Sequence, residues 1–425
     1  MLSVDLDLLE DRLHREAVLQ LEKEAPSRRL NRERVRRLVW ELLQGEGVIL
    51  PRAQEEELVE NVVNRILGLG PLEPLLQDPE ITEIMVNGPD AVFIERNGRL
   101  ERVPVRFRDE QHLLQVIDRI VAPLGRRVDE SMPYVDARLP DGSRVNVIIR
   151  PLAVRGPALT IRKFSATPFT LKRLVRLGTL TEPMARFLQA CVRARLNILV
   201  SGGTGAGKTS TLNALARAIP PGERIITIED TAELQLKAEN LVSLEARPPN
   251  IEGKGEVTIR TLVRNALRMR PDRIIVGEVR GPEAFDMLQA MNTGHPGSMT
   301  TIHANSPADA VRRLESMVLM AGLELPQPTI REYIASAIHV IVQQERLPDG
   351  RRRMVEIVEV HPEEGPQGRL RPRLVPLFRF ERRGLDETGR VLGDFVTLQE
   401  AWEASPLREH IRRAGFSVDD PLEEG

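Results

Sequence analysis

Eight consecutive residues, Gly202 to Thr209, match the pattern G-x-x-x-x-G-K-[ST] of a phosphate-binding loop. Glycines allow backbone N–H groups to turn toward β- and γ-phosphates, and the N-terminus of the following helix adds positive charge. Lys208 supplies a mobile cation, and Thr209 supplies a hydroxyl group for Mg²⁺. We therefore predict a nucleotide site whose contacting residues are Gly202, Gly203, Thr204, Gly205, Ala206, Gly207, Lys208, Thr209 and Ser210.

The segments on either side of this loop support the prediction. An apolar run, residues 197–201, precedes the loop and is expected to form a buried strand, and residues 210–217 have a helical pattern. A strand, a loop and a helix in this order are what a phosphate-binding loop requires. A glycine-rich turn that matches the pattern by chance would not need such flanks.

Nucleotide hydrolysis also needs a carboxylate on a neighbouring strand, to hold Mg²⁺ or to orient water. Two further apolar strands end in acidic residues. Residues 273–276 are followed by Glu278, and residues 224–228 are followed by Glu229 and Asp230. Each carboxylate in isolation is typical of a helix or loop cap. A phosphate-binding loop in the same sheet favours the catalytic interpretation.

Composition limits the class of protein. The 425 residues, 41% of them hydrophobic, predict two or three domains, and the net charge of −2 favours neither nucleic acid nor an anionic membrane. A single cysteine, Cys191, excludes a disulfide framework and a multi-cysteine zinc site, and suits a reducing cytoplasm. No apolar run approaches the roughly 18 residues of a membrane span. We expect a cytoplasmic protein without a direct membrane span, which reaches a membrane only through partners.

The hydrophobic pattern changes along the chain and predicts five segments. Residues 1–66 are helical, 67–166 form an α+β domain of short strands and hairpins, and 167–182 form a linker. In residues 183–360 helices alternate with apolar strands, which is typical of an α/β domain with a wound sheet. Residues 361–425 form a C-terminal extension to which the sequence assigns no role.

Four ordered motifs in this chain resemble the Asp box, Walker B and His boxes of the type II/IV secretion ATPase superfamily. They are residues 228–234, 270–281, 293–295 and 299–305. Upstream segments resemble the CpaF branch, the motor of tight-adherence (Tad/Flp) pili. These segments are residues 68–76, 84–88, 135–146 and 159–164.

The resemblance implies a RecA-like P-loop NTPase domain preceded by a smaller, PAS-like domain and a helical bundle. It also implies a homo-hexameric ring that hydrolyses ATP with Mg²⁺. By position in the motifs, Glu278 polarises the attacking water. Because Gly277 stands where many P-loop enzymes have aspartate, Mg²⁺ would rely on Thr209, waters and the pair Glu229 and Asp230.

The same resemblance implies roles for two histidines and three arginines. His295 and His303 would lie near the γ-phosphate or at a subunit contact. The transferred phosphoryl group carries spread negative charge that one lysine does not neutralise, so arginines are required. We expect them in segments that resemble the clamp region of the family, as arginine fingers acting in cis or in trans: Arg138, Arg144 and Arg162.

The leading hypothesis is a motor that assembles or retracts a Tad/Flp-type pilus through inner-membrane platform proteins. A motor for type II secretion is disfavoured, because such motors commonly carry a four-cysteine zinc module. A conjugation-type motor for type IV secretion stays an alternative. A RecA-like nucleic-acid motor is disfavoured by the charge balance and by only 3% aromatic residues. A nucleotide-gated scaffold without turnover is disfavoured because Lys208, Glu278 and both histidines occur together.

Overall fold

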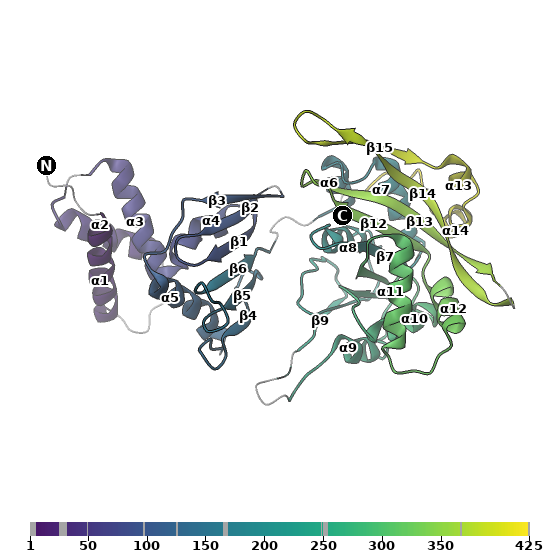
Figure 1. Ribbon diagram of the computed structural model, residues 1–425, viewed down its shortest axis with the longest axis horizontal. Coiled ribbons are helices and arrows are strands. Elements are labelled where there is room, and N and C mark those ends of the chain that lie inside the picture. The colour runs from purple at the N-terminus through teal and green to yellow at the C-terminus, as the bar shows by residue number, and fades with distance from the viewer. Residues whose placement is uncertain are drawn as a thin grey trace. The chain divides into compact units, whose positions relative to one another are not determined.

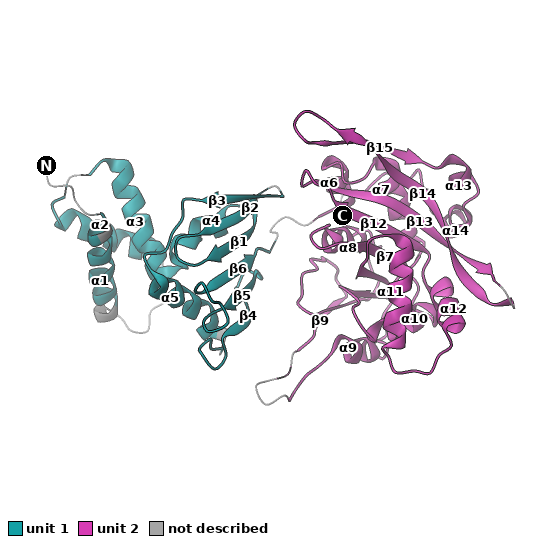
Figure 2. Ribbon diagram, viewed as in Figure 1, with its two compact units in different colours: residues 1–166 teal, residues 167–425 magenta. Residues whose placement is uncertain are grey.

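The computed structural model describes residues 6–24, 32–48, 50–96, 98–124, 126–164, 169–247, 249, 254–365 and 368–423. The chain forms two compact units, residues 1–166 and residues 167–425 (Figures 1 and 2). Each unit has hydrophobic cores of its own, and each is described by itself below.

The first unit begins with three helices, α1 (Leu6–Glu24), α2 (Arg32–Gly45) and α3 (Arg52–Leu67). In α1 the side chains of Leu9, Leu13, Ala17 and Leu21 recur every fourth residue, so they share one face of the helix, and all four are buried. They pack with apolar residues of α2 and α3 in a common core. The helical pattern predicted for this part of the sequence is present.

A six-stranded sheet forms the rest of the first unit within the described residues, in the order β3-β2-β1-β6-β5-β4, and all its neighbours are antiparallel. Alternate side chains of its strands pack against α5, which begins after the N-cap Asp109. The elements are η1 (Gly70–Leu72), α4 (Glu73–Gln77), β1 (Ile81–Asn87), β2 (Val92–Arg96), β3 (Arg99–Val103), α5 (Glu110–Val121), η2 (Ala122–Leu124), β4 (Tyr134–Arg138), β5 (Arg144–Ile148) and β6 (Ala158–Arg162).

Two local features refine the sequence prediction for this sheet. Strand β3 ends at Val103, because the next residue, Pro104, has no N–H group to donate to the ladder. The hairpins predicted for residues 67–166 include one at Asp141-Gly142, which joins β4 to β5, and Gly142 has a φ of 92°, which favours glycine.

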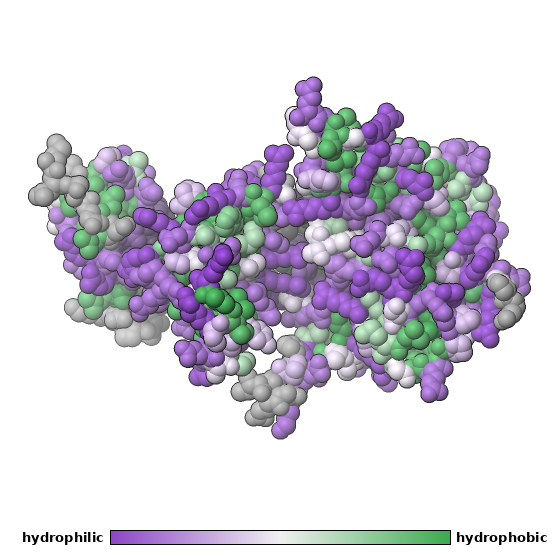
Figure 3. All heavy atoms as spheres, in the orientation of Figure 1, coloured by the Kyte–Doolittle hydropathy of each residue, from purple (hydrophilic) through white to green (hydrophobic). Residues whose placement is uncertain are grey.

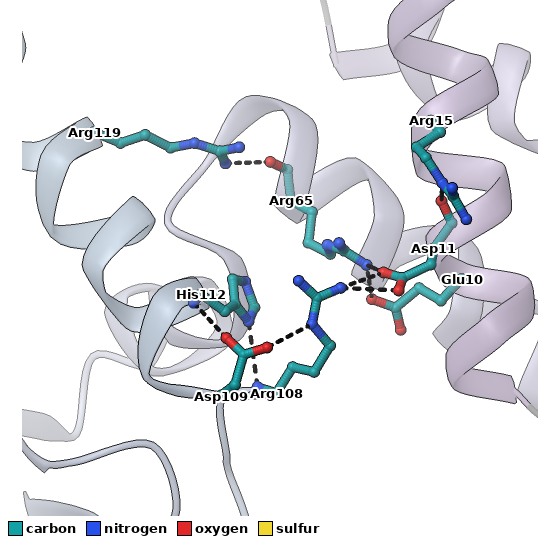
Figure 4. Close-up of polar contacts among 8 residues, drawn as sticks. All are labelled: Glu10, Asp11, Arg15, Arg65, Arg108, Asp109, His112 and Arg119. Carbon is teal, nitrogen blue, oxygen red and sulfur yellow. Dashed lines mark hydrogen bonds and ion pairs between the residues drawn. The ribbon is translucent and has the colours of Figure 1, made fainter.

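A polar cluster connects the helices of the first unit to α5 (Figure 4). Arg65 of α3 lies 3.1 Å from Glu10 and 2.9 Å from Asp11 of α1, and Arg108 lies 2.9 and 2.8 Å from the two carboxylate oxygens of Asp11. Arg119 of α5 donates a hydrogen bond to the carbonyl oxygen of Arg65. Burial opposes ionisation of Asp11, but Arg65 and Arg108 together hold its pKa below the usual value. The Asp11 carboxylate is therefore stabilised by two cations.

The second unit is built on a nine-stranded sheet within the described residues, in the order β15-β14-β13-β12-β7-β11-β10-β8-β9. The six strands from β12 to β9 are parallel, and β13, β14 and β15 continue the sheet in antiparallel fashion. The strands are β7 (Ile198–Gly202), β8 (Ile225–Glu229), β9 (Leu241–Glu245), β10 (Arg273–Val276), β11 (Met299–His303), β12 (Val340–Arg346), β13 (Arg352–Glu364), β14 (Leu370–Leu385) and β15 (Val391–Thr397).

Helices cover both faces of this sheet, and each face has its own apolar core (Figure 1). The central strands β7, β8 and β10 are buried along their whole length, which explains their nearly continuous apolar sequences. The helices are α6 (Leu171–Arg176), α7 (Glu182–Arg193), α8 (Lys208–Ala216), α9 (Ile259–Ala266), α10 (Glu283–Asn292), α11 (Pro307–Leu319), α12 (Gln327–Ala337), α13 (Gln399–Glu403) and α14 (Pro406–Arg413).

The C-terminal residues are part of the second unit. The boundary expected at residue 360 falls inside the single strand β13, and β14 and β15 extend the same sheet. Leu407 and Ile411 of α14 join the core that contains α7. Helix α6 lies in the segment expected to be a linker, whereas residues 167 and 168 of that linker lie outside the described residues.

No helix among the described residues is both long and apolar enough to cross a membrane. In the view of Figure 3, hydrophobic side chains lie in separate patches among hydrophilic ones and form no continuous belt.

Candidate functional site

The glycine-rich loop lies between β7 and α8, as the sequence predicts. Different structural constraints require glycine at different positions of the loop. Gly205 and Gly207 have φ values of 70° and 96°, a region that side chains with a Cβ atom avoid. At Gly202 a Cβ atom would lie 2.3 Å from the carbonyl oxygen of Gln344 on the adjacent strand β12. The loop conformation therefore depends on both backbone freedom and close strand packing.

Lys208 is the first residue of α8 and is nearly buried, with 7% of its surface exposed. Its Nζ donates a hydrogen bond to the carbonyl oxygen of Gly203 at 3.1 Å and lies 3.3 Å from Nε2 of His303. His303 reaches this position because β11 runs parallel to β7 and places His303 opposite Gly202 in the register. The structure thus brings the loop lysine and one of the two predicted histidines together.

Glu278 continues this network. It follows β10 by two residues, and its Oε1 lies 2.9 Å from Nε2 of His303. Its Oε2 accepts a hydrogen bond from Arg280 at 2.8 Å, and Arg280 also lies 3.5 Å from Asp230. Burial and the nearby Lys208 lower the pKa of His303, so its ring is neutral near pH 7. The contact between His303 and Glu278 is therefore a polar contact with a neutral ring.

Glu229 lies at the end of β8 and is 4% exposed. Its Oε1 accepts hydrogen bonds from the backbone N–H groups of Glu233 and Leu234, at 2.9 and 3.2 Å. A Cβ atom on Gly277 would lie 2.9 Å from Cγ of Glu229. The Glu229 side chain therefore fills the space beside Gly277, which is the position of the aspartate in many other P-loop enzymes.

His295 lies apart from this group. It precedes β11, and its carbonyl oxygen accepts a hydrogen bond from Ser298 at 2.8 Å. The five residues of β11 span about 16 Å. His295 is therefore at the opposite edge of the sheet from His303. The expectation that the two histidines lie near the γ-phosphate or at a subunit contact stays a prediction.

The three predicted arginines lie in the first unit and form one row. Arg138 of β4 is opposite Arg144 of β5, and Arg144 is opposite Arg162 of β6. Directly opposed residues of antiparallel strands point to the same face of a sheet, so the three side chains share a face. Glu83 of β1 continues the row, and its Oε1 lies 3.9 Å from Nε of Arg162. Their role as arginine fingers stays a prediction.

Residues of the hairpin formed by β12 and β13 also lie at the loop, although no sequence motif predicts them there. Gln344 is 1% exposed and accepts a hydrogen bond from Thr211 of α8 at 2.7 Å. Arg352 donates a hydrogen bond from Nε to the carbonyl oxygen of Gly205 at 2.9 Å. The available signal was the turn Pro348-Asp349-Gly350, which has arginines on both sides but matches no phosphate-binding motif.

The residues present fit a nucleotide with a magnesium ion. A Cβ atom at Gly202 would collide with the backbone of β12, and one at Gly207 would crowd the side chains of Gln344 and Arg352. The turned backbone between them can cradle phosphates with its N–H groups. Thr209, the second residue of α8, could supply a hydroxyl ligand, and Glu229 a carboxylate, while waters complete the octahedron that Mg²⁺ prefers. No group of three or more histidine, cysteine or acidic side chains suited to a metal occurs in the described part of the chain.

A glycine loop at the end of a central parallel strand, with a lysine beside it and a carboxylate on a nearby strand, defines the P-loop nucleotide-binding class. Residues 66–362 match the family described as type II/IV secretion system protein. The chain belongs to this family.

Relatives by sequence support this assignment. A putative conjugal transfer protein of Mycobacterium tuberculosis is 39% identical over 337 residues, which are 78% of this chain and 94% of that protein. The type IV secretion system protein VirB11 of Brucella suis is 35% identical over 318 residues, 68% of this chain and 87% of that protein.

The fold is also found in a solved structure. The ATPase DotB of Yersinia pseudotuberculosis has a TM-score of 0.50 and 18% identity over 73% of this chain and 80% of that chain. The predicted fold class, a RecA-like domain preceded by an α+β domain, is confirmed.

Proposed function

We propose that this protein binds ATP in the loop from Gly202 to Thr209 and hydrolyses it. The observation that carries the proposal is the network at the carboxyl ends of the central strands. Nε2 of His303 lies 3.3 Å from Nζ of Lys208 and 2.9 Å from Oε1 of Glu278, so the loop cation and the carboxylate lie in one connected group. A protein that only bound nucleotide would not need a carboxylate held in this position.

Each side chain of the network has a role in the proposed reaction. Lys208 neutralises charge on the phosphates, and Glu278 orients and polarises the attacking water. Arg280 donates a hydrogen bond to Oε2 of Glu278, which orients the carboxylate, and His303 lies beside Oε1.

A magnesium ion held by Thr209 and Glu229 would neutralise charge that develops on the phosphates. Glu229 also orders the turn after β8 through its backbone hydrogen bonds. Binding of the ion and order in this turn are therefore linked through one side chain. Asp230, which lies beside Arg280, would support the same region.

We infer that hydrolysis drives a motor of the type II/IV secretion class. The names of the relatives, a conjugal transfer protein and a type IV secretion protein, favour the conjugation-type motor over the Tad/Flp pilus motor. The proposed assembly is a homo-hexamer bound to inner-membrane partners at the cytoplasmic side. In it Arg138, Arg144 and Arg162 would complete the nucleotide site of the same or a neighbouring protomer.

Substitution of Glu278 tests the enzymatic proposal. Glu278→Gln keeps the shape and removes the charge, so the variant should bind magnesium ATP with a Kd within about threefold of the native value. Its turnover should fall at least about 100-fold, because the water loses its carboxylate. A matched control is Glu356→Gln, which changes a half-buried glutamate of β13 that forms an ion pair with Arg379 of β14. Unchanged phosphate release by Glu278→Gln would refute the assignment.

A further inference from the structure

The hairpin of β12 and β13 lies against the phosphate loop and carries two arginines at its end. Arg346, the last residue of β12, is directly opposite Arg352, the first residue of β13. The hairpin closes through Pro348-Asp349-Gly350, where Gly350 has a φ of 84°. Both arginines are thus fixed by the strand register and not by a free loop.

Arg352 contacts the loop at two glycines. Its Nε donates a hydrogen bond to the carbonyl oxygen of Gly205 at 2.9 Å. A Cβ atom placed on Gly207 would lie 3.1 Å from Cδ of Arg352, which is tighter than an ordinary contact. The half-buried side chain therefore packs on the loop and fixes the orientation of one of its peptide groups.

Arg346 lies beside the same loop but is exposed to solvent. Its Nη1 and Cδ lie 3.6 and 3.8 Å from the position of a Cβ atom on Gly205. An exposed guanidinium at this distance from a phosphate-binding backbone is within reach of a phosphate oxygen, for which its planar, multiply donating geometry is suited.

Two contacts anchor the base of the hairpin to the site. Gln344 is buried and accepts a hydrogen bond from Thr211 of α8, and its carbonyl oxygen closely approaches Gly202. The next arginine in the chain, Arg351, points to a different partner, because it forms an ion pair with Asp349 at 2.6 Å. In this hairpin Arg351 therefore stabilises the turn, whereas Arg346 and Arg352 lie beside the phosphate loop.

We propose that the β12–β13 hairpin is part of the nucleotide site. Arg352 is a positioning residue that holds the phosphate loop through Gly205, and Arg346 binds the phosphate groups of the nucleotide from the same protomer. This inference rests on the proposed function. It adds two cationic side chains, Arg346 and Arg352, to the site, independently of the arginines of the first unit.

Calorimetric titration of the full-length protein with magnesium and a non-hydrolysable ATP analogue, AMP-PNP, tests the proposal. Hydrogen bonds to charged groups contribute about 1.5–3 kcal/mol, so Arg346→Gln should raise the Kd by about 10- to 100-fold. Arg352→Gln should raise it by at least about tenfold, and Arg352→Lys should recover most of the loss because Nζ can still donate to Gly205. The melting temperature without nucleotide should stay within about 2 °C for Arg346→Gln, because this side chain is exposed.

The matched control is Arg382→Gln, which removes an arginine paired with Glu345, the neighbour of Arg346 whose side chain points to the other face of β12. Its Kd should equal that of the native protein. If Arg346→Gln binds AMP-PNP as tightly as the control does, the assignment of Arg346 is overturned. If Arg352→Lys binds no better than Arg352→Gln, the positioning role is overturned. Absence of AMP-PNP binding by the native protein would instead refute the proposed function itself.

Discussion

The space beside Gly277 makes a quantitative prediction. Introducing the aspartate of other P-loop enzymes, Gly277→Asp, would put Cβ 2.9 Å from Cγ and 3.4 Å from Oε1 of Glu229. Two carboxylates about 4 Å apart repel each other by about 4 kcal/mol at an effective dielectric constant of about 20. Protonation of one carboxylate would not reduce this free-energy cost, because protonating an ordinary carboxyl group, with a pKa near 4, at pH 7 also costs about 4 kcal/mol.

Steric crowding adds to this repulsion. An extra carbon atom in a packed site costs about 1–3 kcal/mol, and Gly277→Ala measures that part alone. We expect Gly277→Asp to lose clearly more stability than Gly277→Ala. We also expect its affinity for magnesium ATP to fall at least about tenfold, because the displaced Glu229 no longer orders the turn after β8.

Urea unfolding followed by the fluorescence of Trp402 is a suitable assay. Trp402 packs against Phe187 and Phe378 in the core of the second unit, with ring centroids 5.4 and 5.1 Å away. The other tryptophan, Trp40, belongs to the first unit and is replaced by phenylalanine in every variant of this Gly277 series. Changes in the unfolding free energy then report on the second unit.

A double-mutant cycle with Glu229→Ala isolates the interaction between the two positions. Native protein, Gly277→Asp, Glu229→Ala and the combined variant should give a coupling free energy of at least about 4 kcal/mol, because Glu229→Ala removes both the charge and the Cγ atom that crowds the new Cβ. The combined variant should therefore be more stable than the sum of the single changes predicts. A coupling below about 1 kcal/mol would refute the reasoning that Glu229 fills the aspartate position.

Three further predictions concern other parts of the chain. Burial, and then His410, lower the pKa of His339 to about 4, so its folded state binds fewer protons than the unfolded ring with a pKa near 6.5. This stability, up to about 3 kcal/mol, is present above pH 6.5 and lost as the pH falls toward 4, and His339→Gln should flatten that slope in urea unfolding. Asp11→Asn removes the carboxylate beside Arg108 and should destabilise the first unit by about 1–2 kcal/mol, measured by Trp40 fluorescence. Gly202→Ala should weaken AMP-PNP binding at least about tenfold in calorimetry, because its Cβ would collide with the backbone of β12.

Each of these outcomes can fail. If the unfolding free energy of His339→Gln varies with pH as that of the native protein does, His339 does not cause the loss of stability at low pH. Full stability of Asp11→Asn would show that the polar cluster of Figure 4 contributes nothing to the first unit. If Gly202→Ala binds AMP-PNP as tightly as the native protein does, β7 and β12 can separate without a change in the phosphate loop.

Much of the fold could be predicted because its signals are local. The phosphate loop follows from glycines and a lysine at fixed spacing, and the central strands follow from apolar runs such as residues 197–201 and 273–276. His295 could also have been separated from His303. It precedes residues 298–302 and His303 follows them, and the two ends of a strand of that length lie at opposite edges of a parallel sheet.

The contacts of the β12–β13 hairpin could not be predicted in this way. Arg352 and Gly205 are 147 residues apart, and only the order of the strands brings them together. The reason for Gly277 was also hidden, since it depends on the side chain of Glu229 in the neighbouring strand β8. Local periodicity determines which segments are strands, but it does not determine their lateral order.

The row formed by Arg138, Arg144 and Arg162 has a consequence for the energetics of the first unit. Arginines on directly opposed strands repel one another, and Glu83 at the β1 end of the row offsets part of this repulsion. An anion bound on that face would add to the compensation and would strengthen the pairing of β4, β5 and β6. The stability of this part of the sheet would then depend on whether the anion is bound.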